Sequence, residues 1–323
     1  MTLRDYLNIS CAIGMLAALS LNAEAAIADT AALGSTARGG TSQMGRTLAT
    51  VISANGVLQM RPQELANTAD YIPLVNAGEM EFGIANVVQV IHAVAGIGMS
   101  EGRPNQNLQM VATLTPFRNA YIVRADSDIH SFSDLKGKRV PIFAGGALGD
   151  YLTKAFFANP DMSLDEVDGV AVPNFPRMWS SFADGATDVT IVVVGAGNSR
   201  EFDASFGIRY LSFENTSGAL ARMREWLPQT YLQEMPAGSV PGIKKPTYVN
   251  VFDYTLFAGK DVPEDMVYAA VRALWEREGD LLAGGPIWNG FAKESMGKNV
   301  GIPYHAGAIR FYEEMGVWED RAQ

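Results

Sequence analysis

The segment Leu33–Ile52, LGSTARGGTSQMGRTLATVI, has the pattern of a short strand, a glycine-rich turn and a helix. Behind the turn, Met44, Leu48, Val51 and Ile52 follow the spacing of one helical face, which predicts an amphipathic helix. Glycines allow a tight bend and a close approach to a ligand, and the free N–H groups of a helix start favour a carboxylate, sulfonate or phosphate. An ordinary strand-to-helix turn has the same pattern, so both interpretations stay open for this segment.

A second unit of this kind begins at Val140–Phe143, a predicted strand that is followed by Gly145, Gly146 and a helix. The segments VNAGEMEFGIA (Val75–Ala85) and FADGATDVTIV (Phe182–Val192) also match, each with a helix end, a glycine, an acidic residue and an apolar strand. Two similar α/β lobes that face each other would explain both repeats. Coincidence is the alternative, because helix–glycine–strand joints are common in α/β proteins.

The composition is that of a globular protein, and it excludes some functions. The 323 residues are enough for two domains or one large domain, and 48% of them are hydrophobic against 19% charged. The formal net charge of −10 argues against a nucleic-acid partner, which requires a basic face. It does not argue against an anionic small molecule, because the local field of a cleft decides that affinity.

The N-terminus has the features of an export signal. Arg4 is followed by the apolar run Ile9–Leu21, which is too short for a stable membrane anchor, and by the small-x-small cleavage pattern AEA at residues 23–25. We predict that residues 1–25 are a signal peptide, whose removal also removes Cys11, the single cysteine. A mature chain without thiols suits an oxidising periplasm, so we expect an exported, soluble, periplasmic protein.

Two segments resemble a known family. GSTARGGTSQMG (residues 34–45) looks like the N-terminal signature of the TAXI solute receptors, which are the substrate-binding proteins of one class of TRAP transporters. MPAGSVPGIKKPTYVNVFDYTLFAGKDVPEDMV (residues 235–267) is similar to the most recognisable block of that family, with its Pro-Ala-Gly-x-x-Pro-Gly turn. Ser42 and Gln43 stand where the family usually has one or two tyrosines, so the family's ligand does not transfer on this motif.

The resemblance implies an α/β, two-lobed type II periplasmic-binding-protein fold, in which each lobe is a mixed sheet flanked by helices. A hinge of two strands would join the lobes, with crossings that we place near Ile122–Arg124 and Ala237–Gly242. Before the first crossing, the apolar pattern predicts two separate strands, Leu108–Leu114 and Ala120–Val123. The expected divisions are residues 1–25 for the signal peptide, 26–123 and 238–323 for lobe 1, and 124–237 for lobe 2.

The candidate ligand contacts lie on turns that follow predicted strands, because open α/β sheets bind ligands at the carboxyl ends of their strands. Arg118 is a further candidate that adds a cation just before the first crossing, although a surface ion pair would be an equally good role for it. No catalytic residue and no metal ligand is assigned. The candidates are Thr36, Gly39, Gly40, Thr41, Ser42, Asn86, Arg118, Gly145, Gly146 and Ala147, with Asn174, Phe175, Gly197 and Asn198 as secondary ones.

Other chemistries find little support in the sequence. His92, His130 and His305 are the only histidines, and none has the spacing of a metal motif such as HExxH. Neither a Walker sequence nor a dinucleotide fingerprint is present. Residues 98–102, GMSEG, formally satisfy GxSxG, but a nucleophile elbow needs a preceding strand and a following helix. Here a helical run precedes the motif and a loop follows it.

From these observations and the resemblance to the TAXI receptors, we expect a non-enzymatic periplasmic receptor of a TAXI-type TRAP transporter, without a cofactor. It would capture a small anionic or zwitterionic solute that carries a carboxylate, by hinge closure, and deliver it to the TRAP membrane permease. We expect a monomer with no nucleic-acid partner. A binding protein of the same fold that serves an ABC importer is the alternative, and a secreted serine hydrolase built around Ser100 is a more distant one.

Overall fold

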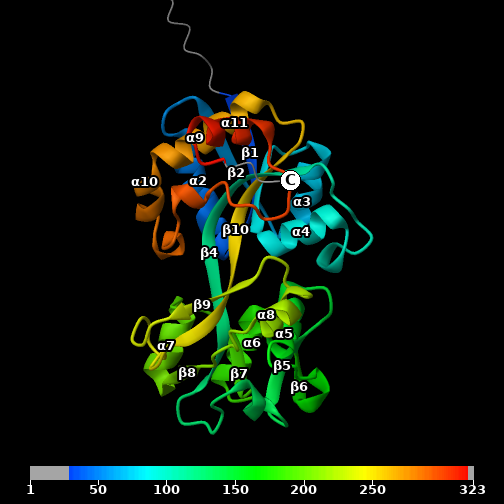
Figure 1. Ribbon diagram of the computed structural model, residues 1–323, viewed down its shortest axis with the longest axis vertical. Helices are drawn as coiled ribbons and strands as arrows, with labels where there is room; N and C mark the ends of the chain where they lie inside the picture. The colour runs from blue at the N-terminus through cyan, green and yellow to red at the C-terminus, as the bar shows by residue number, and fades with distance from the viewer. Residues whose placement is uncertain (1–28, 319–323) are drawn as a thin grey trace, which may run out of the picture.

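The computed structural model describes residues 29–318. The predicted signal peptide, residues 1–25, lies outside this range, as does its cleavage pattern. No helix within residues 29–318 is long and apolar enough to cross a membrane. The described chain forms two lobes, one above the other in Figure 1, and two long strands run from one lobe into the other.

Lobe 1 contains a mixed sheet with helices packed on it. Three parallel strands lie in the order β2-β1-β3, each followed by a helix, and β10 then runs antiparallel to β3 and pairs with β4. Parallel neighbours need such crossover helices, which explains why each strand of this group is followed by one. The elements of lobe 1 are β1 (Asp29–Thr36), α2 (Gly40–Ser53), β2 (Leu58–Leu65), α3 (Thr68–Ala77), β3 (Phe82–Asn86), α4 (Val87–Ala95), η1 (Gly98–Ser100), α9 (Glu264–Glu276), α10 (Glu278–Ala283), η4 (Pro286–Trp288), η5 (Lys293–Ser295) and α11 (Ala306–Glu314).

Lobe 2 is smaller and is built around the other halves of the two long strands. β7 and β8 pair with β4, β9 pairs with β10, and β5 and β6 form a separate parallel pair. Both lobes therefore combine strands and helices, which confirms the predicted α/β class. The elements of lobe 2 are η2 (Phe132–Leu135), β5 (Arg139–Phe143), α5 (Leu148–Ala158), η3 (Leu164–Glu166), β6 (Asp168–Val172), α6 (Phe175–Ala183), β7 (Val189–Val193), α7 (Gly197–Phe206), β8 (Ile208–Tyr210), α8 (Ser217–Arg224) and β9 (Tyr231–Met235).

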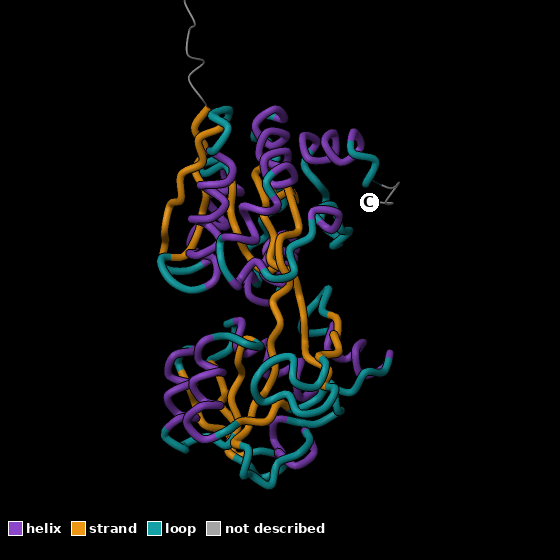
Figure 2. Tube along the Cα trace, turned by 90° about the vertical axis from the view of Figure 1, so that its left-hand side faces the viewer, coloured by secondary structure: helices purple, strands orange, loops and turns teal. Residues whose placement is uncertain are grey.

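The two long strands are β4 (Leu108–Arg124) and β10 (Thr247–Gly259), which pair antiparallel and connect the lobes (Figures 1 and 2). In lobe 1, the first half of β4 pairs with the second half of β10, which also pairs with β3. In lobe 2, the second half of β4 pairs with β7 and β8, and the first half of β10 pairs with β9. Each strand thus changes partners midway along its length.

This change of partners corrects the positions expected for the crossings. We propose that the chain crosses at Pro116–Asn119 and Asn250–Asp253, where the pairing passes from one lobe to the other. The expected position Ile122–Arg124 is already paired with β7 and β8, and Gly242 of the second expected position packs against β8. Both therefore lie within lobe 2.

The two strands predicted before the first crossing, Leu108–Leu114 and Ala120–Val123, are one continuous strand. The polar residues and Pro116 between them interrupt the apolar pattern, which is why the sequence suggested a break. The backbone nevertheless stays extended, because each half of β4 has hydrogen-bonded neighbours. The β10 register shifts between Asp253 and Thr255, directly opposite Pro116, so an irregularity accommodates the residue that has no N–H to donate.

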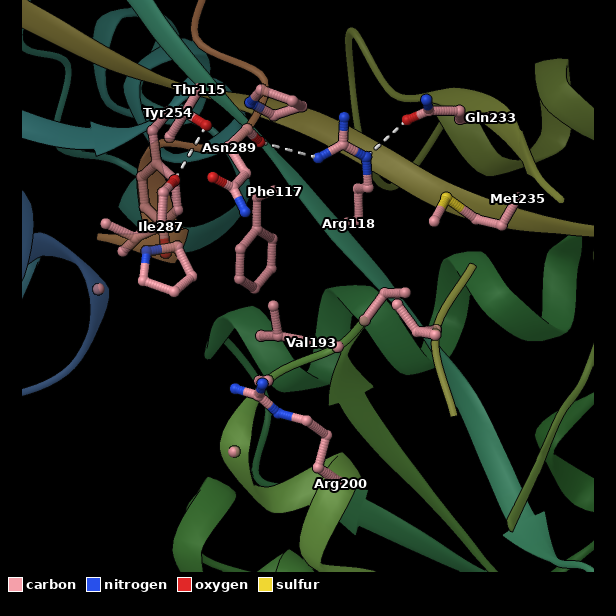
Figure 3. Close-up of a pocket in the computed structure, with 18 of the residues that line it drawn as sticks. Thr115, Phe117, Arg118, Val193, Arg200, Gln233, Met235, Tyr254, Ile287 and Asn289 are labelled. Carbon is pink, nitrogen blue, oxygen red and sulfur yellow. Dashed lines mark hydrogen bonds between the residues drawn. The ribbon is translucent and has the colours of Figure 1, made fainter. Parts of the chain in front are cut away.

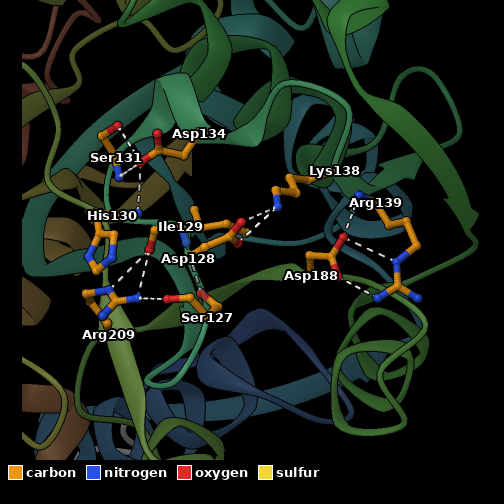
Figure 4. A network of polar contacts seen from close by, with 10 residues as sticks. All are labelled: Ser127, Asp128, Ile129, His130, Ser131, Asp134, Lys138, Arg139, Asp188 and Arg209. Carbon is orange, nitrogen blue, oxygen red and sulfur yellow. Dashed lines mark hydrogen bonds and ion pairs between the residues drawn. The ribbon is translucent and has the colours of Figure 1, made fainter.

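The internal repeat predicted from the sequence has a structural counterpart. In lobe 1, the Glu81 carboxylate accepts a hydrogen bond from the backbone N–H of Ala32 in β1 (2.7 Å). In lobe 2, the Asp188 carboxylate accepts one from the backbone N–H of Arg139 in β5 (2.8 Å) and also pairs with the Arg139 guanidinium (Figure 4). Each acidic residue therefore fastens the strand that leads into a glycine turn, and the repeat is confirmed.

Candidate ligand-binding cleft

A cleft of about 730 Å³ lies between the lobes, beside the hinge strands. Lobe 1 contributes the start of α2 and the segment around η4, while lobe 2 contributes the β7–α7 turn and β9 (Figure 3). The crossing part of β4 lines the cleft between them. The charged residues along its wall are Arg118, Arg200 and Glu234, so two cations and one anion border the space.

The α2 helix begins at this cleft, and its N-terminal end is open. Gly39, the residue before the helix, has φ 86°, a conformation that favours glycine, and no side chain caps the helix start. The first turn of α2 contains no acidic residue. A Cβ on Gly40 would lie 3.0 Å from the Tyr254 hydroxyl oxygen and 3.3 Å from Ile287 Cδ1, so glycine leaves room for these side chains. The positive end of the helix dipole therefore faces the cleft without a protein anion on it.

Three neighbouring candidates shape this turn and do not line the cleft. The hydroxyl groups of Thr36 and Thr41 are hydrogen-bonded to each other, and the Thr36 N–H donates to Thr41 Oγ1 (3.3 Å). Ser42 is buried, and its hydroxyl accepts a hydrogen bond from the Arg46 guanidinium (2.7 Å). These contacts hold the turn between β1 and α2 in one shape, so the two glycines are presented in a fixed position.

Arg118 extends from β4 into the cleft and is held by both lobes. Its Nε donates to Gln233 Oε1 of β9 (2.7 Å), and its Nη1 donates to the backbone carbonyl of Asn289, just after η4 (3.3 Å) (Figure 3). Within residues 29–318 the guanidinium forms no ion pair, so the surface ion pair considered above is not what the structure shows. Because a guanidinium has five N–H donors, these two bonds leave donors for an anion.

Arg200 is a functional candidate that the sequence analysis missed. It lies in the first turns of α7 and points into the cleft from lobe 2 (Figure 3). Its guanidinium is exposed and makes neither a hydrogen bond nor an ion pair with the described part of the chain. The sequence could have indicated Arg200 through its position three residues after Gly197, a candidate turn residue. Residues three apart in a helix lie on the same face, so a ligand beside Gly197 would also be near Arg200.

Between these cations the cleft is mainly apolar, with two hydroxyl groups. The Phe117 ring packs against the rings of Phe252 and Tyr254, with centroids 5.2 and 5.3 Å away. Burial raises the pKa of Tyr254, so its hydroxyl stays protonated and can donate a hydrogen bond. Thr115 Oγ1 donates to the Ile287 carbonyl (3.1 Å) and holds the η4 segment against β4. A small organic acid with an apolar body would match this surface.

The second glycine turn does not line this cleft. Gly145, Gly146 and Ala147 are exposed and lead into α5. The Gly146 N–H donates to Asp150 Oδ2 (3.2 Å), and the same carboxylate pairs with Lys154 (2.9 Å). The start of α5 therefore already has an anion of its own, which disfavours a second one.

The remaining candidates have local structural contacts. Asn86 and Asn174 each accept a hydrogen bond from the backbone N–H three residues further on (3.0 Å in both cases), at the starts of α4 and α6. Asn198 Oδ1 accepts one from the next residue's N–H (2.9 Å), and the Phe175 ring packs against neighbouring aromatic rings. None of these four side chains lines the cleft. The predicted residues that do line it are Gly39, Gly40, Arg118 and Gly197.

The alternative of a hydrolase built on Ser100 has no support in the geometry. Ser100 lies in η1, which follows α4 and not a strand. The nearby His92 uses Nδ1 to accept a hydrogen bond from the Met99 N–H (3.2 Å), and burial lowers the pKa of this histidine. Among residues 29–318, no group of three His, Cys, Asp or Glu side chains could hold a metal ion.

Comparisons with known proteins found several similar solved structures. A TctC solute binding protein from Polaromonas is 15% identical, with a TM-score of 0.53 and 82% of this chain and 90% of that chain covered. PhnD1 from Prochlorococcus marinus, solved in complex with methylphosphonate, is 9% identical, with a TM-score of 0.51 and coverage of 90% and 99%. The periplasmic aliphatic sulphonate binding protein SsuA from Escherichia coli is 14% identical, with a TM-score of 0.47 and coverage of 80% and 76%.

A family comparison matches residues 33–316, nearly the whole described chain, to the NMT1-like family. At the identities above, the likeness to solved structures shows the fold alone. The chain has the two-lobed fold of periplasmic solute-binding proteins, and it belongs to the NMT1-like family.

Proposed function

We propose that this chain is an exported receptor that captures a small organic anion, carrying a carboxylate, in the cleft between its lobes. The observation that carries the proposal is that Arg118 and Arg200 border the same cleft without an ion pair among the described residues. The open N-terminus of α2 adds a third positive feature on the lobe 1 wall of the cleft. Glu234 also borders the cleft and would suit the ammonium group of a zwitterion.

Capture would proceed by closure of the lobes about β4 and β10. A solute that contacts both walls favours the arrangement in which the walls are closest, and it shifts the equilibrium only as far as it prefers that arrangement. All the groups named above belong to one chain, so the receptor would work as a monomer. The ligand-facing groups among residues 29–318 carry charge or donate hydrogen bonds, which supports a role in binding.

The membrane partner that we propose is a TRAP permease of the TAXI type. This part rests on the resemblance of residues 34–45 and 235–267 to the TAXI receptors, together with the predicted signal peptide. An ABC importer could use a receptor of the same fold. A gene for a many-span TRAP permease beside the gene for this chain would favour the first partner, and a gene for an ATPase subunit would favour the second.

The test begins with the full-length chain expressed with its own N-terminus and purified from the periplasmic fraction. Thermal-shift measurements would compare dicarboxylates, amino acids and sulfonates, because a ligand that binds only the folded state raises the melting temperature. Titration calorimetry would then measure wild type and Arg200→Ala. If Arg200 pairs with the solute in a desolvated cleft, its loss should weaken binding by about 2–5 kcal/mol.

Two results would contradict the proposal. One is stabilisation by neutral solutes alone, because a neutral solute has no acid group that could pair with Arg118 or Arg200. The other is a loss within about 1 kcal/mol for Arg200→Ala, which is the size expected for a solvated surface charge. Small-angle scattering with and without the bound solute tests closure separately, since an unchanged radius of gyration with proven binding would reject it.

A further inference from the structure

Gln233 stands out among the residues around the cleft because it contacts the cation that the ligand would need. It lies on β9 in lobe 2, partly buried, and its Oε1 accepts the Arg118 Nε–H at 2.7 Å. The two residues are 115 positions apart in the chain, so the contact depends on the fold and on no local pattern. An amide that accepts from Nε restrains the direction of that N–H, and a second acceptor at an Nη atom restrains the plane of the guanidinium, because Nε and both Nη atoms are coplanar.

The other side of the Arg118 guanidinium is fixed by lobe 1. Nη1 donates to the Asn289 carbonyl at 3.3 Å. The next residue, Gly290, has φ 107°, and a Cβ there would lie only 3.0 Å from Arg118 Nη2. Glycine at this position therefore leaves space for the guanidinium, and the group sits between an acceptor from each lobe.

The chemistry of the two acceptors matters as much as their positions. Both are neutral: an amide oxygen and a backbone carbonyl. A carboxylate at either place would form a bidentate ion pair with Arg118 and compensate its charge. Neutral acceptors hold the group in place and leave the positive charge, with three of its five N–H donors, for another anion.

We propose that Gln233 is a positioning residue that holds the Arg118 guanidinium in a fixed orientation and keeps its charge available to an acid group in the cleft. This role for Gln233 rests on the proposed function, because it assumes that the solute is an anion. Since Gln233 belongs to lobe 2 and Asn289 to lobe 1, the orientation of Arg118 depends on both lobes at once.

Three variants of the full-length chain separate positioning from charge. Gln233→Met keeps the length of the side chain and removes the acceptor. Gln233→Glu keeps an acceptor and adds a negative charge. Gln109→Met makes the same change on β4, the strand that carries Arg118, at a residue that does not line the cleft, and it serves as the matched control.

The first measurement needs no transported solute. Nitrogen-15 NMR would follow hydrogen exchange at the Arg118 Nε–H. The resonance of this group is assigned as the signal that is absent from the spectrum of Arg118→Lys. We expect exchange in Gln233→Met to be faster than in wild type by about tenfold, the size of one lost hydrogen bond, and unchanged in Gln109→Met. In Gln233→Glu the Nε–H should stay protected. Wild-type exchange rates in Gln233→Met would overturn the proposal.

The second measurement uses sodium sulfate as the probe anion, with sodium chloride at equal ionic strength as the reference, and follows the same resonance. Wild type should show a saturable shift of the Arg118 signal. In Gln233→Met, half-saturation of the shift should need about tenfold more sulfate than in wild type. In Gln233→Glu there should be no saturable shift, because the introduced carboxylate pairs with the Arg118 guanidinium and compensates its charge. Equal sulfate titrations for all three Gln233 forms would overturn the role in charge availability.

Failure of the solute screen and failure of this proposal remain distinguishable. If no solute stabilises the chain but the exchange and sulfate results follow expectation, the positioning role stands and the transport proposal falls. If a solute binds tightly and Gln233→Met binds it like wild type, the transport proposal stands and the positioning role falls.

Discussion

The two glycine turns of this protein look alike in sequence and differ in the charge that follows them. At β1–α2, Gly39 leads into a helix whose first turn has no acid and no side-chain cap. At β5–α5, Gly146 leads into a helix whose third residue is Asp150, which accepts the Gly146 N–H and pairs with Lys154. Only the first turn borders the cleft.

From this difference we infer that a glycine turn before a helix can serve as an anion site only when no acidic side chain of the protein already lies at the helix start. The dipole of α5 acts on a carboxylate of the same chain, which satisfies the helix locally. The dipole of α2 has no such partner and acts on whatever occupies the cleft. One residue in the first turn therefore separates a structural cap from a candidate binding site.

The largest effect is expected from Gly40→Val, which adds a branched side chain at the open turn. A Cβ there would approach the Tyr254 hydroxyl to 3.0 Å, and overfilling a packed site costs about 1–3 kcal/mol. Because the added methyl groups also cover the α2 N–H groups, we expect solute binding to be lost in titration calorimetry while circular dichroism still shows a folded chain.

The matched control for that variant is Gly145→Val at the other turn. The nearest atom to a Cβ at Gly145 is Asp150 Oδ2 at 4.0 Å, so the substitution has space and lies outside the cleft. It should bind the solute like wild type. Loss of binding in Gly145→Val with retention in Gly40→Val would reverse the roles that we give to the two turns.

A smaller effect tests how firmly each lobe holds the strand before its turn. Asp188→Asn removes an ion pair and a charged hydrogen bond to Arg139, whereas Glu81→Gln removes one charged hydrogen bond to Ala32. We expect urea unfolding to show a loss of about 1–2 kcal/mol for Asp188→Asn and about 1 kcal/mol or less for Glu81→Gln. A larger loss for Glu81→Gln would mean that lobe 1 depends more on this contact.

The Asp188 contribution should also depend on pH. Partial burial raises the pKa of Asp188, but the hydrogen bonds and charge of Arg139 outweigh it, so the pKa lies below its usual value in the folded chain. A group with a depressed folded pKa stabilises the protein above its unfolded pKa, near 3.9 for aspartate, and the contribution is lost as the pH falls. The stability difference between wild type and Asp188→Asn should therefore be constant near pH 7 and shrink below about pH 4.

The smallest effect comes from making the two turns alike. Gln43→Glu places an acid in the first turns of α2, at the cleft. A carboxylate at a helix start contributes about 0.3–1 kcal/mol, so the variant should unfold at slightly higher urea and bind an anionic solute roughly two- to fivefold more weakly. Asp150→Asn is the reciprocal change: it should lower stability by a similar amount and leave binding unchanged. Stronger anion binding by Gln43→Glu would contradict an open helix terminus as part of the site.

Much of the local structure could be predicted, because neighbouring residues determine it. The spacing of Met44, Leu48, Val51 and Ile52 predicted α2, and all four side chains are buried. The sequence repeat aligned Glu81 with Asp188, and the structure adds that each carboxylate accepts a backbone hydrogen bond from a neighbouring strand. The break predicted within β4 was wrong, because the partners that keep the strand extended come from distant parts of the chain.

The sequence by itself determined the α/β class and the two strand–turn–helix units, since periodicity and turn chemistry act over a few residues. It named Gly39, Gly40, Arg118 and Gly197 among its candidates but did not separate them from the candidates that lie outside the cleft. Only the tertiary structure decided that Arg118 meets Gln233, 115 residues away, and Asn289, 171 residues away, and that Arg200 borders the same cleft. The physical reason is that long-range strand pairing sets which side chains face one cleft, and no local pattern records that pairing.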